Sequence, residues 1–498
     1  MFSPNLEEVK EIAKDNEYKR IPISYELFSD MATPIEVLRI LKGISNHTYM
    51  LESVEDSKKW GRYTFLGFNP LLEVTCQNGV VKIRGDEDFN ELTDDEKIIR
   101  TDRPNEIIKE LVLKNKSPKF KNLPPFTGGF VGYFAYDYIK YQEPSLNLDA
   151  ENQDQFKDID LMLFDKVIAF DNFKQKIIII VNMKTDDLES GYEKACNDIK
   201  EIANLIKNGE RIEIAPLKLK SDFKPVFSRE RFCDMVEKAK NYIYEGDIFQ
   251  VVLSNKIEAD ISGSLFDTYR VLRTTNPSPY MFYFSSNDIE IAGASPETLV
   301  KLDDDKLYTF PLAGTRPRGK TDQEDEELER NLLSDEKELA EHNMLVDLGR
   351  NDIGRIAEIG SVKVEKYLSV EKFSHVMHIG STVSGTLRSD LDSLAAIDSI
   401  LPAGTLSGAP KIRACEIINE LEDNKRGIYG GAIGYVDLSG NVDTCISIRI
   451  AFARNNKVFI RSGAGIVADS VPEKEFEECL NKAAAVIDAL KIADGGLE

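Results

Sequence analysis

The sequence has few of the residues that build zinc sites, disulfide frameworks or membrane spans. Only four histidines occur, so a zinc site is not expected. The most apolar run, residues 176–183, is too short to cross a bilayer, and the N-terminal segment has no apolar signal core. The cysteines show no C-x-x-C spacing and indicate reduced thiols in a cytoplasmic protein; they are Cys76, Cys196, Cys233, Cys415, Cys445 and Cys479.

Positive charge is also scarce. There are 63 Lys and Arg against 86 Asp and Glu, which gives a formal net charge of -23. An excess of this size disfavours nucleic acid and anionic membranes as partners. It also means that an anionic ligand needs local cations to overcome the overall field.

The length and composition predict a folded protein of more than one domain. The chain has 498 residues, and 42% of them are hydrophobic, which is enough to bury a large core. A segment near 210–228 contains two prolines and no clear period, so we place a boundary there. The two expected regions are 1–215 and 225–490.

Three segments carry helix signals. The first opens at Thr33, which stands as an N-cap before Pro34. Residues 188–209 form an amphipathic pattern that ends at a glycine. Residues 470–490 form the third, and Ser470 and Glu473 have the spacing of a capping box.

Two segments read as antiparallel strands. Residues 161–183 place two β-rich runs around a turn, which predicts a hairpin, and residues 428–467 predict a three-stranded meander. In the meander, "ISIRI" places Ile446, Ile448 and Ile450 on one face of a strand and Arg449 on the other, toward solvent or a site. Strands and helices do not alternate strictly, so the predicted fold class is α+β, with large antiparallel β-sheets flanked by helices.

Two acidic pairs stand at helical spacing. Glu338 and Glu341 are three residues apart, and Glu475 and Glu478 repeat the step near the C-terminus. Either pair alone is consistent with a solvated helix face that makes weak ion pairs. Two helices that each present a carboxylate pair also have the chemistry to share one Mg²⁺ ion.

Several glycine-rich turns are ambiguous by themselves. In "FPLAGTRPRGK", Gly314 and Thr315 can approach a ligand, or the arginines can pair with the acidic run that follows. "LPAGTLSGAPK" resembles an anion cradle around Thr405, but it is not a Walker A loop. "SGAGI" offers backbone donors at Gly463 and Gly465, or is simply a turn.

Taken in order, the motifs resemble the chorismate-binding enzymes over residues 225–490. The motifs are "GDIFQVVLS", "AGASPETLV", "PLAGTRPRG", "DEKELAEHNMLVDLGRNDIGR", "FSHVMHI", "LPAGTLSGAPK", "YGGAIGY" and "SGAGIVADSVPEKEFEE". The front third resembles the N-terminal half of one branch, anthranilate synthase component I, through "PISYELFSDMATPIEVL", "YMLESVEDSKKWGRYTFLG" and "FTGGFVGYFAYD". That branch aminates chorismate at C2 and eliminates pyruvate, as the first committed step of tryptophan biosynthesis.

The resemblance assigns four catalytic roles. It implies that Glu297 is the general acid that protonates the departing C4 hydroxyl, which requires a raised pKa. Relatives that add water carry a lysine base where this chain has Gln250, and an amide can orient ammonia without acting as a base. His378 is implied to assist the aromatising step, and Thr405 is implied to lie beside it in the catalytic set.

The resemblance also implies a substrate and metal site. Mg²⁺ would be held by Glu341 and Glu478, with Glu338 and Glu475 acting through water, and would bind the ring carboxylate of chorismate. The implied contacts with chorismate are Gly314, Thr315, Tyr429, Arg449, Gly463, Ala464, Gly465 and Lys482.

Regulation and a partner are implied as well. The implied tryptophan feedback site comprises Leu51, Glu52, Ser53, Pro279, Tyr280 and Met281, although an ordinary core strand and turn would also explain these residues. No cysteine lies in a G-x-C-x-G elbow, so a separate glutamine amidotransferase subunit would supply ammonia in a hetero-oligomer.

Two other functions remain to be weighed. The first is an aminodeoxychorismate synthase component; such enzymes often carry lysine where this chain has Ala313. The second is a non-catalytic, tryptophan-sensing subunit, against which the intact catalytic set argues.

Overall fold

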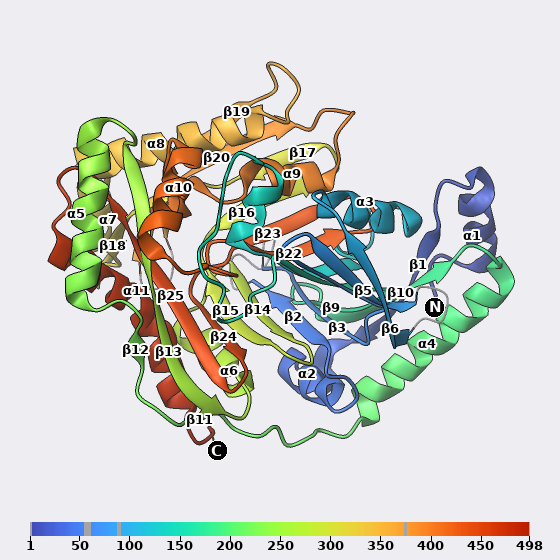
Figure 1. Ribbon diagram of the computed structural model, residues 1–498. Helices are drawn as coiled ribbons and strands as arrows, with labels where there is room; N and C mark the ends of the chain where they lie inside the picture. Colours follow the sequence, from blue (N-terminus) through green and yellow to red (C-terminus); the bar gives the residue numbers. More distant parts are fainter. Residues whose placement is uncertain (1, 54–60, 87–90, 373–375, 498) are drawn as a thin grey trace.

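The computed structural model describes residues 2–53, 61–86, 91–372 and 376–497. The described residues form two large antiparallel sheets with helices around them (Figure 1), which confirms the predicted fold class. Their strand pairings are antiparallel throughout apart from one isolated bridge between Glu151 and Asn424.

The first sheet has 13 strands within the described residues. In spatial order they are β1 (Arg20–Phe28), β10 (Lys176–Lys184), β9 (Lys166–Asp171), β3 (Tyr63–Phe68), β2 (Thr48–Glu52), β14 (Tyr280–Ser285), β15 (Glu290–Ser295), β24 (Ile450–Arg454), β25 (Lys457–Ile466), β13 (Gln250–Ser262) and β11 (Lys218–Leu219), with β12 (Lys224–Pro225) and β21 (Gly408–Ala409) also on β13.

The second sheet has 12 strands within the described residues. In spatial order they are β18 (Leu312–Pro317), β20 (Val376–Thr386), β17 (Lys306–Thr309), β16 (Thr298–Asp303), β23 (Val442–Ile446), β22 (Ala432–Asp437), β7 (Gly129–Phe134), β8 (Ile159–Phe164), β4 (Leu72–Gln77), β5 (Val80–Asp86) and β6 (Glu91–Arg100), with β19 (Lys363–Lys372) on β20.

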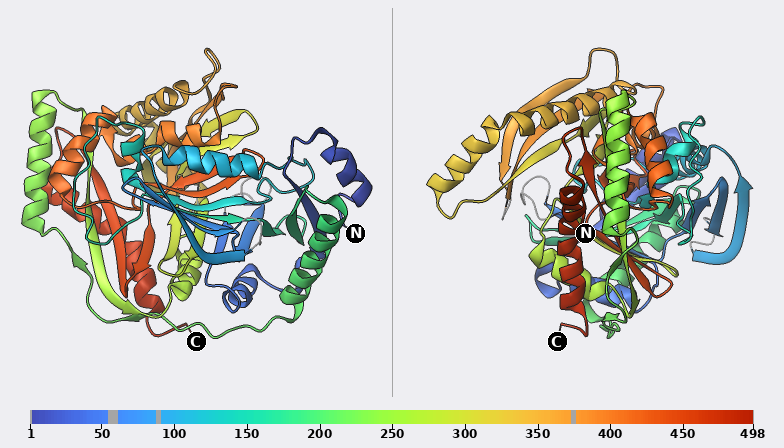
Figure 2. Two further views of the ribbon diagram at one scale, coloured as in Figure 1. Left: turned by 45° about the vertical axis from the view of Figure 1, so that its right-hand side comes forward. Right: turned by 60° about the vertical axis from the view of Figure 1, so that its left-hand side comes forward.

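Helices cover the outer faces of the sheets (Figure 2). Those packed on the first sheet are α2 (Pro34–Lys42), α4 (Leu188–Asn208), α6 (Phe266–Thr275) and α11 (Pro472–Ala493). Those packed on the second sheet are α3 (Pro104–Lys114), α8 (Glu336–Gly354) and α9 (Ser393–Ile400). The others are α1 (Leu6–Ile12) beside α4, α7 (Asp322–Ser334) beside α8, and α5 (Arg229–Glu245) and α10 (Lys411–Glu422) beside β13.

The main core between the sheets is aromatic. Tyr49 of the first sheet meets Phe164 of the second with ring centroids 4.7 Å apart, and Phe65 meets Tyr435 edge to face. Fully burying one such ring contributes about 1.5–3 kcal/mol. The sheets are therefore held face to face by side chains that alternate along strands from both halves of the chain.

Both sequence regions contribute strands to both sheets. In the first sheet β2 pairs with β14, and in the second β7 pairs with β22. The boundary segment runs irregularly from α4 to β11 along one side of the molecule (Figure 1). The regions 1–215 and 225–490 are therefore separate in sequence, but in the structure they share the same two sheets.

Most of the locally signalled elements are present. Thr33 caps α2 in a capping box, α4 ends at Gly209, and β9 and β10 form the expected hairpin, although the first residues of that run belong to β8 in the other sheet. The capping box at Ser470 is wrong. Val471 occupies the N-cap of α11, and the Ser470 hydroxyl accepts a hydrogen bond from the backbone N–H of Val467 instead.

The predicted three-stranded meander is also wrong. Residues 428–467 form four strands in two hairpins, β22 with β23 in the second sheet and β24 with β25 in the first. Between them, Arg449 adopts a left-handed conformation with φ of 53°, so it lies outside any strand. Such a conformation is uncommon for a non-glycine residue and breaks the alternation that the isoleucines predict.

Candidate functional site

The site is built where the chain crosses between the sheets. Pro296 and Glu297 connect β15 of the first sheet to β16 of the second, and Ser447–Arg449 connect β23 back to β24. The backbone N–H of Ile446 donates to the carbonyl of Glu297 over 2.9 Å, which ties the two crossings together. An acid and a cation from distant positions are thereby placed side by side.

Glu297 has the environment of a general acid. Burial raises the pKa of its carboxyl to about 7, while the Thr405 hydroxyl and the charges of Arg449 and Lys482 act in the opposite direction. Thr405 lies in a short 3-10 turn, Gly404–Leu406, and donates to Oε1 of Glu297 over 3.2 Å. At neutral pH a substantial fraction of this carboxyl therefore carries a proton.

Arg449 is a cation beside that acid. Within the described residues its guanidinium has no hydrogen-bond or ion-pair partner in the protein, and its side chain is exposed. The expectation that Arg449 faces a site is consistent with its electrostatic interaction with Glu297, although a loop and not a strand positions it. A guanidinium presented in this way can clamp a carboxylate through two parallel hydrogen bonds.

His378 lies on β20, opposite Gly314 of β18. Its Nδ1 is 2.8 Å from the carbonyl oxygen of Gly314, which only accepts hydrogen bonds, so the proton is on Nδ1. Burial lowers the pKa of the imidazole and keeps it neutral. Gly314 has φ of 63°, and a Cβ atom there would lie 2.9 Å from Leu332. The predicted turn is a bulge in β18, and the side chain of Thr315 lies outside the described residues.

Gly463 and Gly465 of β25 form one surface of the site, called here the floor, and polar side chains pack against it. A Cβ atom at Gly463 would lie 2.9 Å from the Tyr429 hydroxyl, and one at Gly465 would lie 2.9 Å from the Gln250 amide nitrogen. Ala464 between them pairs with Leu253 of β13. A Cβ atom at Gly463 would also lie 2.7 Å from the backbone oxygen of Leu253, so glycine is required there, whereas the Gln250 side chain could move away from a Cβ atom at Gly465. The predicted substrate contacts Tyr429, Gly463 and Gly465 lie together with Gln250.

Lys482 reaches this floor from α11. Its ammonium donates to the carbonyl oxygen of Gly463 over 3.2 Å and pairs with Glu478 over 2.6 Å. The same ammonium acts on the pKa of Glu297. Lys482 therefore connects the predicted substrate-binding floor to the acidic helix pairs.

The four predicted metal ligands lie on two neighbouring helices. On α8, burial and the charges of Glu338 and Glu478 raise the pKa of Glu341, and on α11, burial and the charge of Glu478 raise the pKa of Glu475. Glu338 also pairs with Arg316 over 3.2 Å. Hard carboxylate oxygens that repel one another fit a hard divalent cation. In the described part of the chain, however, no three acidic, His or Cys side chains are already gathered at metal-binding distance.

The predicted tryptophan-site segments are brought together by strand pairing. Glu52 pairs with Met281 and Leu51 with Phe282 across β2 and β14, while Pro279 and Tyr280 lie at the start of β14. The Tyr280 hydroxyl donates to Asp443 over 2.7 Å. Ser53 follows directly after β2 and is half-buried.

Sequence reasoning missed the residues that hold Glu52. Its carboxylate accepts hydrogen bonds from the Tyr269 hydroxyl over 2.6 Å and from Arg273 over 3.0 Å. Tyr269 and Arg273 are four residues apart on α6, so the helical spacing was a usable signal. The carboxylate of Glu52, a residue of the predicted tryptophan site, is therefore already oriented by a protein cation.

Two global expectations are consistent with the described residues. All six cysteines are free thiols. A search of these residues for a helix long and apolar enough to span a membrane finds none.

Comparison with known proteins gives matches over nearly the whole chain. A family model described as chorismate binding enzyme matches residues 49–488. Anthranilate synthase component 1 of Acetivibrio thermocellus is 46% identical over 501 residues, and that of Aquifex aeolicus 44% identical over 502, with 99% of each chain covered in both cases. The crystal structure of anthranilate synthase component I from Streptococcus pneumoniae TIGR4 matches with a TM-score of 0.74 and 38% identity, covering 92% of this chain and 98% of that one.

Proposed function

Because the chain belongs to the chorismate-binding enzyme family, we propose that it is the chorismate-converting component of an anthranilate synthase. In this reaction ammonia forms a bond to C2 of chorismate as the C4 hydroxyl departs as water. The C2 proton and the enolpyruvyl ether are then lost, which releases pyruvate and leaves the aromatic ring of anthranilate. The product would enter tryptophan biosynthesis, as its first committed intermediate.

The observation that carries this proposal is the carboxyl of Glu297, whose pKa is raised by burial to about 7. A departing hydroxide is a poor leaving group, and a carboxyl with a pKa of about 7 can protonate it at working pH. Thr405 holds the carboxyl in place, and Arg449 stands beside it as the clamp for a substrate carboxylate. Such an acid is what the first half-reaction requires.

Gln250 supports ammonia over water as the nucleophile. Its amide nitrogen lies against Gly465, at the floor of the site. An amide cannot take a proton from water at neutral pH, whereas ammonia needs no base and only has to be oriented. The neutral His378, with its proton on Nδ1, supports a role in the aromatising step.

We propose Mg²⁺ as the cofactor, held by Glu341 and Glu478, with Glu338 and Glu475 acting through water. The mutual repulsion of these carboxylates and their hard oxygen donors support this assignment. When bound, the ion supplies positive charge that docks the ring carboxylate of chorismate in an otherwise acidic protein. Lys482 links the same helix to the floor at Gly463.

Ammonia is proposed to come from a separate glutamine amidotransferase subunit. The similar proteins are named component 1, which supports a second component. Tryptophan is proposed to inhibit by binding between Ser53 and the Pro279–Met281 turn. The pairing of β2 with β14 supports such a site, because it brings these distant segments into contact.

The test is to incubate the purified chain with chorismate, Mg²⁺ and a high concentration of ammonium near neutral pH. Anthranilate is followed by its fluorescence, and chromatography separates it from 4-aminobenzoate and its precursor. Anthranilate and pyruvate in equal amounts support the proposal. Formation of aminodeoxychorismate would instead support the alternative synthase, against which Ala313, buried on β18, argues because it offers no lysine. Tryptophan binding without turnover would support a sensing subunit.

A further inference from the structure

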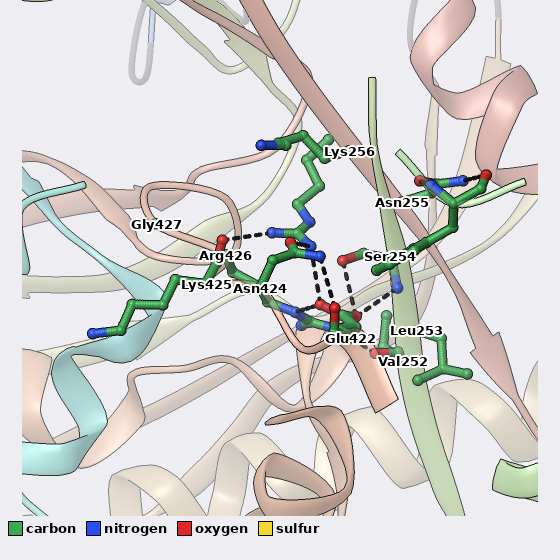
Figure 3. A network of polar contacts seen from close by, with 12 residues as sticks. Val252, Leu253, Ser254, Asn255, Lys256, Glu422, Asn424, Lys425, Arg426 and Gly427 are labelled. Atoms are coloured by element: carbon green, nitrogen blue, oxygen red, sulfur yellow. Dashed lines mark hydrogen bonds and ion pairs between the residues drawn. The ribbon is translucent and has the colours of Figure 1, made fainter. Parts of the chain in front are cut away.

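A buried network of ion pairs and hydrogen bonds joins α10 to β13 (Figure 3). Its centre is Glu422, at the end of α10, with 1% of the side chain exposed. Both carboxylate oxygens are occupied, because the carboxylate accepts from the backbone and hydroxyl of Ser254 and from the guanidinium groups of Arg426 and Arg461. None of these three charged residues is among the groups assigned to the reaction.

The guanidinium of Arg426 contacts three segments that carry proposed site groups. One terminal nitrogen donates to the carbonyl oxygen of Leu406 over 2.6 Å, next to Thr405. The other donates to the carbonyl oxygen of Val252 over 2.6 Å, two residues after Gln250. The same cation lies 5.8 Å from the ring centroid of Tyr429.

The backbone around Arg426 joins these segments further. The N–H of Val252 donates to the carbonyl of Ser407 over 2.9 Å, so β13 and the turn that holds Thr405 are bonded together. Arg426 binds the carbonyl groups on both sides of this junction. The ring of Tyr429 also faces Arg426, and its hydroxyl lies over Gly463.

We propose that Arg426, oriented by Glu422, is a positioning residue that holds Thr405, Gln250 and Tyr429 in register around the substrate. This inference rests on the proposed function. The acid Glu297 is then set indirectly, since the Thr405 hydroxyl that bonds to it belongs to a turn fixed through the carbonyl of Leu406.

Stability alone is a weak explanation for this network. Buried ion pairs are often no more stabilising than well-packed apolar residues of the same volume, because both charges must be desolvated. A planar guanidinium, by contrast, directs five donors at fixed angles, and a lysine ammonium cannot reproduce that pattern. Arginine is therefore suited to bind two backbone carbonyls and one carboxylate at the same time.

The experiment compares Arg426→Lys with a matched control, Arg461→Lys. Arg461 is 5% exposed and shares the same carboxylate, but its other bonds go to the carbonyl of Lys425 and the side chain of Asn424. For Arg426→Lys we expect kcat for anthranilate to fall about tenfold or more, since a misplacement on the order of 1 Å costs up to 10²-fold. We expect Arg461→Lys to stay close to the wild type.

The pH profile separates positioning from general destabilisation. The Thr405 hydroxyl lowers the pKa of Glu297, and Arg449 and Lys482 are the charged groups that face it. Loss of the Thr405 bond raises that pKa, so the fall in rate with rising pH moves to higher pH. Thr405→Val should show the same movement, and the double variant Arg426→Lys/Thr405→Val should add little to either change.

Glu422→Gln provides a second route if Arg426→Lys does not fold. It keeps the volume of the side chain but weakens its hold on Arg426, and it should move the pH profile in the same direction. A profile and kcat like the wild type in the folded variant, or equal losses in Arg426→Lys and Arg461→Lys, would overturn the inference. If the wild-type chain makes no anthranilate, the proposed function fails and the inference falls with it.

Discussion

Two groups of acidic side chains contrast within the proposed site. Glu297 is a single carboxyl at a crossing between the sheets, and burial raises its pKa to about 7. The carboxylates of α8 and α11 are a group of four on two helices, and the side chain of Glu478 is 47% exposed. Under the proposed function, the same functional group would therefore be a proton donor in one place and an oxygen ligand in the other, because burial and neighbours differ.

The largest effect on catalysis is expected from replacing Glu297. Replacing it by Gln keeps the shape and the hydrogen bond to Thr405 but removes the acidic proton. We expect kcat to fall about 10²–10⁴-fold, the usual contribution of general acid catalysis. The anthranilate fluorescence assay measures the loss, and circular dichroism checks the fold. Retention of more than a tenth of the wild-type rate would remove Glu297 from the acid role.

The second prediction tests the proposed metal-ligand role of the carboxylates on α8 and α11. Glu478→Ala should abolish Mg²⁺-dependent turnover, with Mg²⁺ affinity weakened at least about tenfold, while the chain stays folded. Calorimetric titration with Mg²⁺ gives a readout independent of activity. Glu477→Ala is the matched control, because Glu477 is adjacent and pairs with Arg229. Unchanged turnover of Glu478→Ala at saturating Mg²⁺ contradicts the assignment.

The third prediction tests the proposed role of Gln250 in orienting the attacking ammonia. Gln250→Lys places a potential base over Gly465, where the wild type has an uncharged amide. We expect anthranilate formation to fall about 10²-fold, because ammonia is no longer oriented, and traces of a hydroxylated product to appear. Product chromatography distinguishes the two. Full anthranilate activity would show that Gln250 does not face the attacking group.

The smallest effect on catalysis is expected at Ser53, beside the start of β14. Ser53→Phe should keep the uninhibited rate but weaken tryptophan inhibition at least about tenfold, which corresponds to ~1.4 kcal/mol of binding. A ligand there shifts an equilibrium only through unequal affinity for two states, such as two ways in which β2 and β14 meet. Initial rates are measured against tryptophan for both proteins, and superimposable inhibition curves would refute the site.

Local signals in the sequence predicted local structure well. Thr33 and Pro34 begin α2 and Gly209 ends α4, because caps and glycines act within one helical turn. The helical spacing of Glu338 with Glu341 was also sound, since both lie on α8. These features depend on neighbours in sequence and need no knowledge of the fold.

The crossings between sheets were not predictable in the same way. Arg449 occupies a left-handed conformation that alternating isoleucines do not signal, and it lies in the crossing that follows the backbone contact between Ile446 and Glu297. The contact of Lys482 with the carbonyl of Gly463, and that of Arg426 with the carbonyl of Leu406, likewise join distant segments through tertiary packing. Resemblance to a family named the residues, while the structure supplies the physical reason for their proximity.

The central claim is that Glu297 is protonated near neutral pH. Infrared difference spectra between the wild type and Glu297→Gln isolate the carboxyl band of this one side chain as pH is changed. Because burial raises the pKa of Glu297, the protonated band should be complete at acidic pH and disappear as pH rises through about 7, with kcat falling over the same range. A carboxyl already fully ionised at pH values near the ordinary glutamate pKa of about 4.3 would contradict the account.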